Sequence, residues 1–269
     1  MKKGLLTHEF LRIIHGKGLR LSLLTGAVLA LSHVVMYVMP LSKSILSGDY
    51  PLGVYAKWMG GENSTIQPVL FYLIAPVLVV LPYLGTVNED MNTGYVKNIL
   101  LYTTRREYYR VKWVLAFLAA GTAAVVPLLL NFFFTAMFLP AVIPQPGTGL
   151  YPLMAYSLWA EVFYTHPAVY LFFYLALNFI FFGLLATVGL SCSLITQKGY
   201  ICMLFPLFLY LAVYGITQVT GLHAWCPFAT LRPSQPVAAD GWVFLAECFV
   251  LFFAGGVMWA YGWRKKDVF

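Results

Sequence analysis

The sequence predicts an all-α integral membrane protein with six transmembrane helices, and two observations lead to this prediction. Of the 269 residues, 61% are hydrophobic and only 10% are charged, whereas a soluble domain is about 45–50% apolar and about 25% charged. The apolar residues form long continuous runs, which favour helices over the alternating pattern of a β-barrel. This composition excludes a soluble enzyme, a disordered protein and a nucleic-acid-binding domain.

Six of the apolar runs are long enough to cross the membrane, since a helix needs about 20 residues to span a hydrocarbon core of about 30 Å. These runs cover residues 21–39, 68–87, 113–139, 168–195, 201–219 and 242–263. We therefore expect residues 19–269 to form one six-span transmembrane domain. For the outer segments 152–164 and 221–241, the sequence leaves open whether they lie on the surface or re-enter the membrane.

The distribution of Lys and Arg predicts that both termini lie in the cytoplasm. With this orientation, only Lys43, Lys57 and Arg232 of the 17 basic residues fall on the outer side. Cytoplasmic segments of membrane proteins carry just such an excess of positive charge. The net charge of +7 therefore reflects membrane orientation, and no nucleic-acid partner is expected. The predicted location is a bacterial-type cytoplasmic membrane.

Residues 1–18 are expected to form an amphipathic helix on the cytoplasmic membrane surface. Leu6, Phe10 and Ile14 recur at helical spacing, while Lys3 and Arg12 point in other directions. An apolar stripe beside basic residues is typical of a helix that lies in the lipid headgroup region. A water-exposed extension of the first span is the alternative.

The inner loop, residues 88–112, contains the start of a further helix. Thr104 and Glu107 fit the capping-box pattern S/T-x-x-E, in which each side chain satisfies a free backbone N–H of the first helical turn. The pattern predicts a helix that begins at Arg105 and continues into the third span.

A shorter helix is expected before it, over residues 94–102. Glu89 and Asp90 lie near its start, where the helix dipole favours negative charge. Apolar side chains on a charged cytoplasmic projection are typical of a surface that binds another protein. A helix that lies flat on the lipid headgroups would give the same pattern.

This loop resembles the permease subunits of ATP-binding-cassette (ABC) exporters of the type-2 class. The resemblance is carried by Glu-Asp at 89–90, Gly-Tyr-Val-Lys-Asn-Ile-Leu at 94–100 and Thr-Arg-Arg-Glu-Tyr-Tyr-Arg-Val-Lys at 104–112. In that family the loop contains a coupling helix that docks on the ATPase subunit. The positions that the resemblance assigns to docking and coupling are Gly94, Tyr95, Lys97, Asn98, Ile99, Leu100, Arg105, Arg106 and Tyr109.

The resemblance also implies the partners of the chain. Two copies of an ABC ATPase subunit and a second permease chain, identical or related, would complete the transporter within the lipid membrane. ATP and Mg²⁺ would be bound by the ATPase, so this chain would hold no cofactor and would not be an enzyme. The nearly uncharged spans favour a hydrophobic or amphipathic cargo, and related six-span permeases often export antimicrobial-type peptides.

A few polar residues inside the spans are candidates for lining a transport pathway. They are Asn131, Tyr210, Tyr214, Thr217, Gln218 and Glu247. Glu247 is the only carboxylate within a predicted span. It is expected to contact a substrate from a wet cavity, or else to reach the outer interface or pair with Arg232.

No other constellation indicates chemistry. The five His show no metal-ligand spacing with one another, and His223 and Cys226, three residues apart, give only two candidate ligands, so no metal site is expected. The four Cys are expected to be buried, with a Cys226–Cys248 disulfide left open. The alternative function is an ion-coupled secondary carrier that uses Glu247 or His33, or a membrane scaffold without an ATPase.

Overall fold

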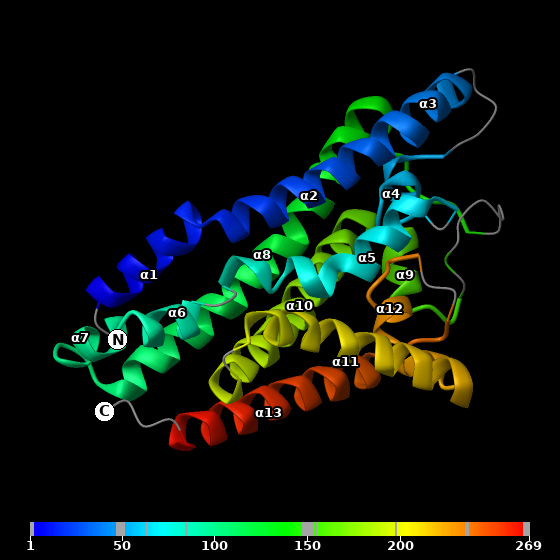
Figure 1. Cartoon of the computed structure of the whole chain (residues 1–269). Coiled ribbons are helices and arrows are strands. Elements are labelled where there is room, and N and C mark those ends of the chain that lie inside the picture. The colour runs from blue at the N-terminus through cyan, green and yellow to red at the C-terminus, as the bar shows by residue number, and fades with distance from the viewer. Residues whose placement is uncertain are drawn as a thin grey trace.

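The computed structural model describes residues 3–46, 52–62, 64–83, 86–146, 153, 155–196, 198–234 and 237–265. All regular elements within these ranges are helices. Six of them are long and apolar enough to cross a membrane, and they form an elongated bundle (Figure 1). The predicted fold class is confirmed.

The six spans match the predicted ranges closely. The first is α2 (Lys17–His33), continued by the π-helix η1 (Val34–Val38) and by α3 (Met39–Leu46). The second is α5 (Ile66–Leu78) with the 3₁₀ turn η2 (Leu81–Tyr83). The others are α8 (Arg105–Phe138), α10 (Pro167–Ile195), α11 (Gly199–Thr220) and α13 (Gly241–Lys265).

The second span ends earlier than the sequence suggests. We expected it to reach residue 87, but Val87 belongs to a separate helix, α6 (Thr86–Asn92). Pro82 lies in η2, and a proline both lacks an N–H and disfavours helical backbone in the residue before it. The α-helix of the span therefore ends at Leu78, before the apolar run does.

Short elements gather at the two ends of the bundle. The helices α1 (Lys3–His15), α6 and α7 (Tyr95–Leu100) lie at one end, which we name the α7 end (Figure 1). The elements α4 (Val54–Lys57), α9 (Ala160–Thr165), η3 (His223–Trp225) and α12 (Pro227–Thr230) lie at the other. The last turns of α13 are also at the α7 end. Both terminal helices thus share one end, as an even number of spans requires.

The N-terminal helix is present, and the side of α1 that contacts the bundle is mixed, with apolar Leu5 and Ile13 beside Glu9. Glu9 and Ile13 are buried against the bundle, while Phe10, Leu11 and Ile14 are exposed. The exposed apolar stripe fits a membrane surface. Its placement there stays a prediction.

The span α10 occupies the centre of the bundle. It packs against α8, α11 and α13 and contributes more residues to the largest apolar core than any other helix, including Tyr174 and Phe182. The helices α11 and α13 bury a much smaller part of their length. Their outward faces are therefore available to lipid or to a second subunit.

The segment 221–241, of which residues 235 and 236 lie outside the described residues, packs into the end of the bundle. The hydroxyl of Tyr72 and the amide of Asn178 donate hydrogen bonds to the carbonyl oxygen of Leu231, at 3.3 and 3.0 Å. Tyr170 donates to the carbonyl oxygen of Pro233 at 2.7 Å. These bonds hold the segment between α5 and α10.

The segment 152–164, also expected on the outer side, folds against the bundle as well. Its residues 152 and 154 lie outside the described residues. The rest leads into α9, where Phe163 is buried and its ring lies 5.1 Å from the ring of Tyr170. Six residues of helix are too few to cross the membrane.

The close approach of α2 to η2 depends on a glycine. A Cβ atom at Gly18 would lie against the carbonyl oxygen of Leu81. We expect Gly18→Ala to lower the free energy of unfolding by about 1–3 kcal/mol, because the backbones must separate. At Gly215 of α11 nothing lies within 4 Å of the added atom, so Gly215→Ala should not lower the melting temperature. Equal melting temperatures of the two variants in detergent would contradict this packing.

Candidate functional site

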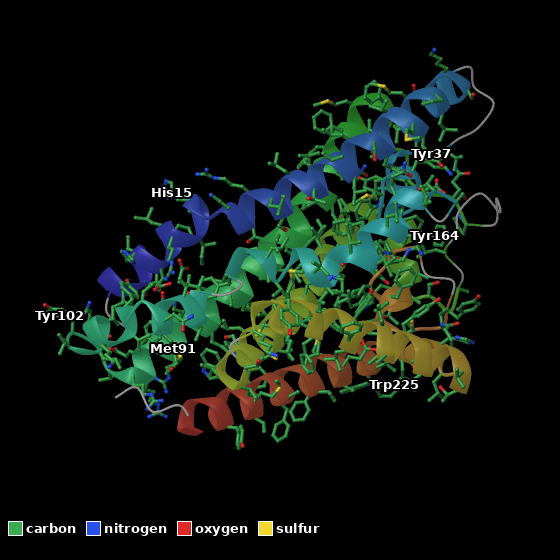
Figure 2. All side chains as sticks on the ribbon, in the orientation of Figure 1. His15, Tyr37, Met91, Tyr102, Tyr164 and Trp225 are labelled. Carbon is green, nitrogen blue, oxygen red and sulfur yellow. The ribbon has the colours of Figure 1, made fainter. Side chains whose placement is uncertain are left out.

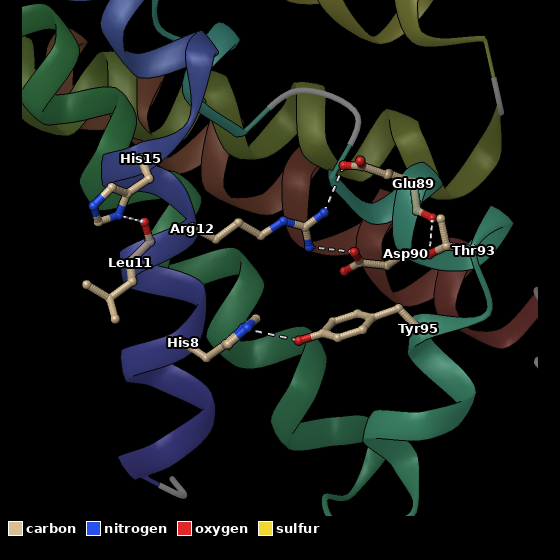
Figure 3. A pocket seen from close by; sticks show the side chains of 8 residues that line it. All are labelled: His8, Leu11, Arg12, His15, Glu89, Asp90, Thr93 and Tyr95. Carbon is tan, nitrogen blue, oxygen red and sulfur yellow. Dashed lines mark hydrogen bonds and ion pairs between the residues drawn. The ribbon is translucent and has the colours of Figure 1, made fainter.

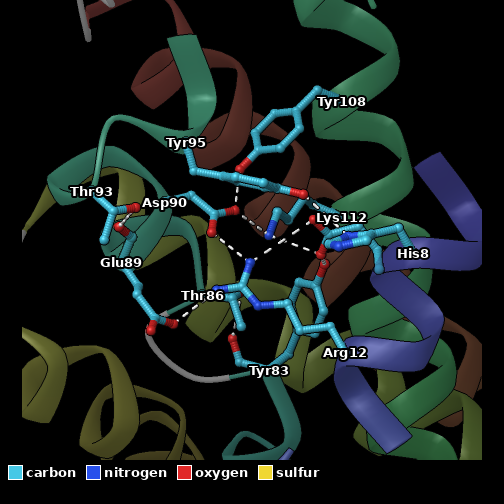
Figure 4. Close-up of polar contacts among 11 residues, drawn as sticks. His8, Arg12, Tyr83, Thr86, Glu89, Asp90, Thr93, Tyr95, Tyr108 and Lys112 are labelled. Carbon is cyan, nitrogen blue, oxygen red and sulfur yellow. Dashed lines mark hydrogen bonds and ion pairs between the residues drawn. The ribbon is translucent and has the colours of Figure 1, made fainter. Parts of the chain in front are cut away.

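Four charged side chains from three helices meet in what we name the ionic cluster (Figure 4). They are Glu9 and Arg12 of α1, Asp90 of α6 and Lys112 of α8. The ammonium nitrogen of Lys112 lies 3.0 Å from Oε2 of Glu9 and 2.6 Å from Oδ2 of Asp90. The guanidinium of Arg12 binds Oδ1 of Asp90 at 2.5 Å. Glu9 and Lys112 have no solvent exposure (0%), so the cluster lies within the protein.

Two tyrosines complete the cluster. Tyr83 donates a hydrogen bond to Oε2 of Glu9 at 2.9 Å, and Tyr108 donates to Oδ2 of Asp90 at 2.6 Å. The ammonium of Lys112 also lies 5.1 and 5.3 Å from the two ring centroids, within reach of cation–π attraction. Burying charges costs several kcal/mol per ion unless such partners offset it. The ionic cluster therefore requires α1, η2, α6 and α8 to be in place together.

The edge of the ionic cluster opens into a pocket of about 520 Å³ between α1 and α6 (Figure 3). Here Arg12 donates to the exposed Glu89 at 2.8 Å and lies 5.9 Å from the ring centroid of Tyr95. The hydroxyl of Tyr95 is 3.1 Å from Nδ1 of His8. These contacts join α1 to the first turn of α7.

The ionic cluster shifts the pKa of Asp90. Burial alone would raise this pKa, but the charge of Lys112 and the hydrogen bonds from Lys112, Tyr108 and Arg12 bring it below the usual value. A carboxyl whose pKa is lower in the folded state stabilises the fold above its unfolded pKa of about 3.9. That contribution is lost as the pH falls through the folded pKa.

We therefore expect Asp90→Asn to lower the melting temperature at pH 7 and to lose its effect in acid. The difference between wild type and variant should be constant above about pH 5 and shrink below about pH 4. Thermal melts in detergent across this range measure the difference. Glu161→Gln, which changes an exposed carboxylate of α9, serves as the control. A difference for Asp90→Asn that persists unchanged at pH 3 would contradict the assignment.

Sequence reasoning missed the ionic cluster and gave its member Asp90 and the adjacent Glu89 a different role. We expected Glu89 and Asp90 to favour the start of the short helix by their charge. Instead they belong to α6, and α7 begins later, at Tyr95. The available signals were Lys112 beside an apolar run and the i,i+3 pair Glu9 and Arg12 on the amphipathic N-terminal helix. Neither signal indicates which residue each charged side chain contacts in the folded protein.

The two predicted helices of the inner loop are present. The short one, α7, covers Tyr95–Leu100 rather than residues 94–102. Gly94 precedes it with φ = 72°, in the left-handed region that favours glycine. The long one, α8, begins at Arg105, and the hydroxyl of Thr104 accepts the N–H of Glu107 at 3.3 Å. The predicted N-cap is confirmed.

The expected docking residues differ in their exposure. Ile99 and Leu100 are half-buried and pack against the core at the α7 end. Tyr109 is buried, and its ring lies 5.4 Å from that of Trp259. The exposed apolar side chains are instead Leu101 (79%) and Tyr102 (76%), in the turn between α7 and α8. Figure 2 shows Tyr102 at the tip of the α7 end.

These observations define a surface that we name the α7–α8 corner. Its exposed residues are Lys97, Asn98, Leu101, Tyr102 and Arg106. Arg105 is half-buried, and its guanidinium lies 5.9 Å from the ring centroid of Tyr109. Two large apolar side chains surrounded by basic and polar ones are suited to binding another protein.

Asn131, a candidate pathway residue, links three parts of the bundle instead. Its Nδ2 lies 2.8 Å from the carbonyl oxygen of Ala30 and 3.2 Å from Nδ1 of His33. Its Oδ1 accepts the N–H of Met59 at 2.6 Å. Asn131 is buried and satisfies its polar atoms within the protein. It therefore holds α2, α8 and the segment after α4 together.

The remaining candidate pathway residues do not all lie in one place. Tyr210, Thr217 and Glu247 line a cavity between α10, α11 and α13. Tyr214 packs edge-to-face on Phe228, with ring centroids 5.5 Å apart, and Gln218 is exposed. The polar face expected on the fifth span is thus divided between the cavity and the outer surface.

Among the described residues, no three His, Cys, Asp or Glu side chains are placed to hold a metal ion. All four Cys are free and buried, so Cys226 and Cys248 form no disulfide in this structure. Comparisons with protein-family models, curated proteins and solved structures find no match to this chain. Function must therefore be inferred from the residues and geometry of the chain.

Proposed function

We propose that this chain is the membrane subunit of an ABC exporter of the type-2 class. A separate ATPase subunit would dock on the α7–α8 corner from the cytoplasm of a bacterial-type cell, with both termini on that side. The observation that supports this proposal most is an exposed apolar tip, Leu101 and Tyr102, at the start of a 34-residue helix that continues through the bundle.

A docking surface can drive transport only if its movement reaches the spans. The helix α8 is unbroken from the corner to its outer end, about 50 Å at about 1.5 Å per residue. The ionic cluster fixes α1 and α6 to α8 near its start. A partner that displaces the corner would therefore move three helices together rather than bend a loop.

The complete transporter would contain two such permease chains, identical or related, and two ATPase subunits. ATP and Mg²⁺ would bind to the ATPase, and this chain would supply the path for a hydrophobic or amphipathic cargo, such as an antimicrobial-type peptide. The exposed apolar faces of α11 and α13 support contact with lipid or with the second permease.

Purification of the tagged chain from its native host in mild detergent tests the proposal. We expect an ATPase subunit that contains a Walker A sequence, identified by mass spectrometry, to co-purify at a ratio near one to one. Recovery of the chain alone, under conditions that keep other membrane complexes intact, would contradict the proposal.

A second candidate function is an ion-coupled carrier. It is favoured by one observation, the carboxylate of Glu247 within a span, which has no hydrogen-bond partner among the described residues. Such groups often take up ions or protons. His33 offers less support, since its Nδ1 contacts Asn131. A carrier predicts transport by the purified chain in liposomes without an ATPase, and loss of that transport in Glu247→Gln. A scaffold predicts neither result.

A further inference from the structure

A cavity of about 410 Å³ lies between α10, α11 and α13, below η3. Its volume falls within the range of about 300–1,000 Å³ that is usual for small-molecule sites. Most of its wall is apolar, with side chains such as Phe181, Leu185 and Leu251. A ligand held here must therefore present a mainly apolar body.

Among the described residues that line the cavity, Glu247 is the one acidic or basic side chain. Both carboxylate oxygens of Glu247 are shielded from solvent, and neither has a hydrogen-bond partner among the described residues. Arg232, the expected partner, is engaged elsewhere: it donates to the carbonyl oxygen of Glu62 and lies over the ring of Phe228. An ionised carboxylate in an apolar site is costly unless a cation meets it.

The other polar groups of the wall suit a cation as well. The hydroxyls of Thr217 and Thr220 donate to backbone carbonyls of α11, each at 2.8 Å. The hydroxyl of Tyr210 has no partner among the described residues, and its ring can attract a cation. Among the described residues, no Lys or Arg lines the cavity. No fixed positive charge in its wall would therefore repel a bound cation.

The cavity is accessible from the side of the bundle. Ile216 of α11 and Val250 of α13 both line it and are each 62% exposed. Both belong to apolar helix faces at the membrane-spanning surface. A ligand that partitions into lipid can thus enter between α11 and α13.

From these observations we propose that the cavity binds an amphipathic organic cation. Its ammonium, guanidinium or similar group would lie against Glu247, and its apolar body would fill the space between α10, α11 and α13. This site belongs to the chain alone, so the inference does not depend on an ATPase partner.

The experiment uses tetraphenylphosphonium, a hydrophobic monocation, as the probe. The purified chain is placed in phosphatidylcholine nanodiscs, and binding of the tritiated probe is measured after subtraction of binding to empty nanodiscs. We expect saturable binding by the wild type. Glu247→Gln, which keeps the shape of the side chain, should weaken the affinity at least about tenfold. Leu251→Trp, which fills the cavity, should also prevent binding.

Two controls make the result specific. Glu161→Gln alters an exposed carboxylate of α9 and should bind the probe as the wild type does. Tetraphenylborate, of similar shape and opposite charge, should not compete for the site. Absence of saturable binding by the wild type, or equal affinity in Glu247→Gln, would overturn the proposal.

Discussion

Lys112→Met is expected to lower the free energy of unfolding by about 3–5 kcal/mol, because breaking a buried ion pair leaves its partner charges uncompensated. In this chain the change would leave Glu9 and Asp90 without the ammonium that lies 3.0 and 2.6 Å from them. Thermal melts in detergent measure the loss. Proteolysis near Gly16, between α1 and α2, should also become faster as α1 detaches.

A matched control is available on α7. Lys97 is exposed, so Lys97→Met should leave the melting temperature unchanged. The triple variant Glu9→Gln, Asp90→Asn, Lys112→Met should recover much of the loss, because it removes the opposing charges together. A melting temperature for Lys112→Met equal to that of the wild type would show that the ionic cluster does not join α1 and α6 to α8.

The double variant Leu101→Asp, Tyr102→Asp is expected to release the proposed ATPase subunit. Both side chains are exposed, so the folded chain should keep its melting temperature. The two new carboxylates would lose their hydration at the centre of an apolar contact. Large side chains at the centre of an interface can each contribute about 2 kcal/mol or more to binding, and the variant would lose that contribution. We expect co-purification of the ATPase to fall at least about tenfold.

Two comparisons separate docking from folding in this experiment. Ile99→Asp should both weaken docking and lower the melting temperature, because Ile99 packs against the core. Tyr156→Asp, at an exposed position of the opposite end of the bundle, should change neither. Unchanged co-purification in the double variant would exclude the α7–α8 corner as the docking surface.

The spans could be predicted from sequence because the membrane imposes a local rule. A helix that crosses lipid must be apolar over about 20 consecutive residues. A span can therefore be predicted from the residues of that one segment, without knowing the rest of the fold. The N-cap at Thr104 is local in the same way, since its partner is three residues away. The early end of the second span was missed because the apolar run continues past Pro82.

The ionic cluster could not be predicted, because it depends on contacts between distant segments. Glu9 and Lys112 are 103 positions apart, and no periodicity relates them. The exposure of the corner depends on tertiary packing too. The sequence favours Ile99 and Leu100 as apolar docking residues, but the fold turns them toward the core and leaves Leu101 and Tyr102 outside. Glu247 could be recognised from sequence as an unusual residue within a span. That it has no hydrogen-bond partner among the described residues could be learned only from the positions of Arg232 and α11.

A photoreactive amino acid at position 102 tests most directly whether an ATPase docks on the α7–α8 corner. Illumination in native membranes should produce an adduct between this chain and a protein with a Walker A sequence. The same amino acid at position 156, at the opposite end, should produce no such adduct. Absence of the adduct at position 102 in an intact, folded chain, or equal yield from both positions, would contradict the proposed exporter.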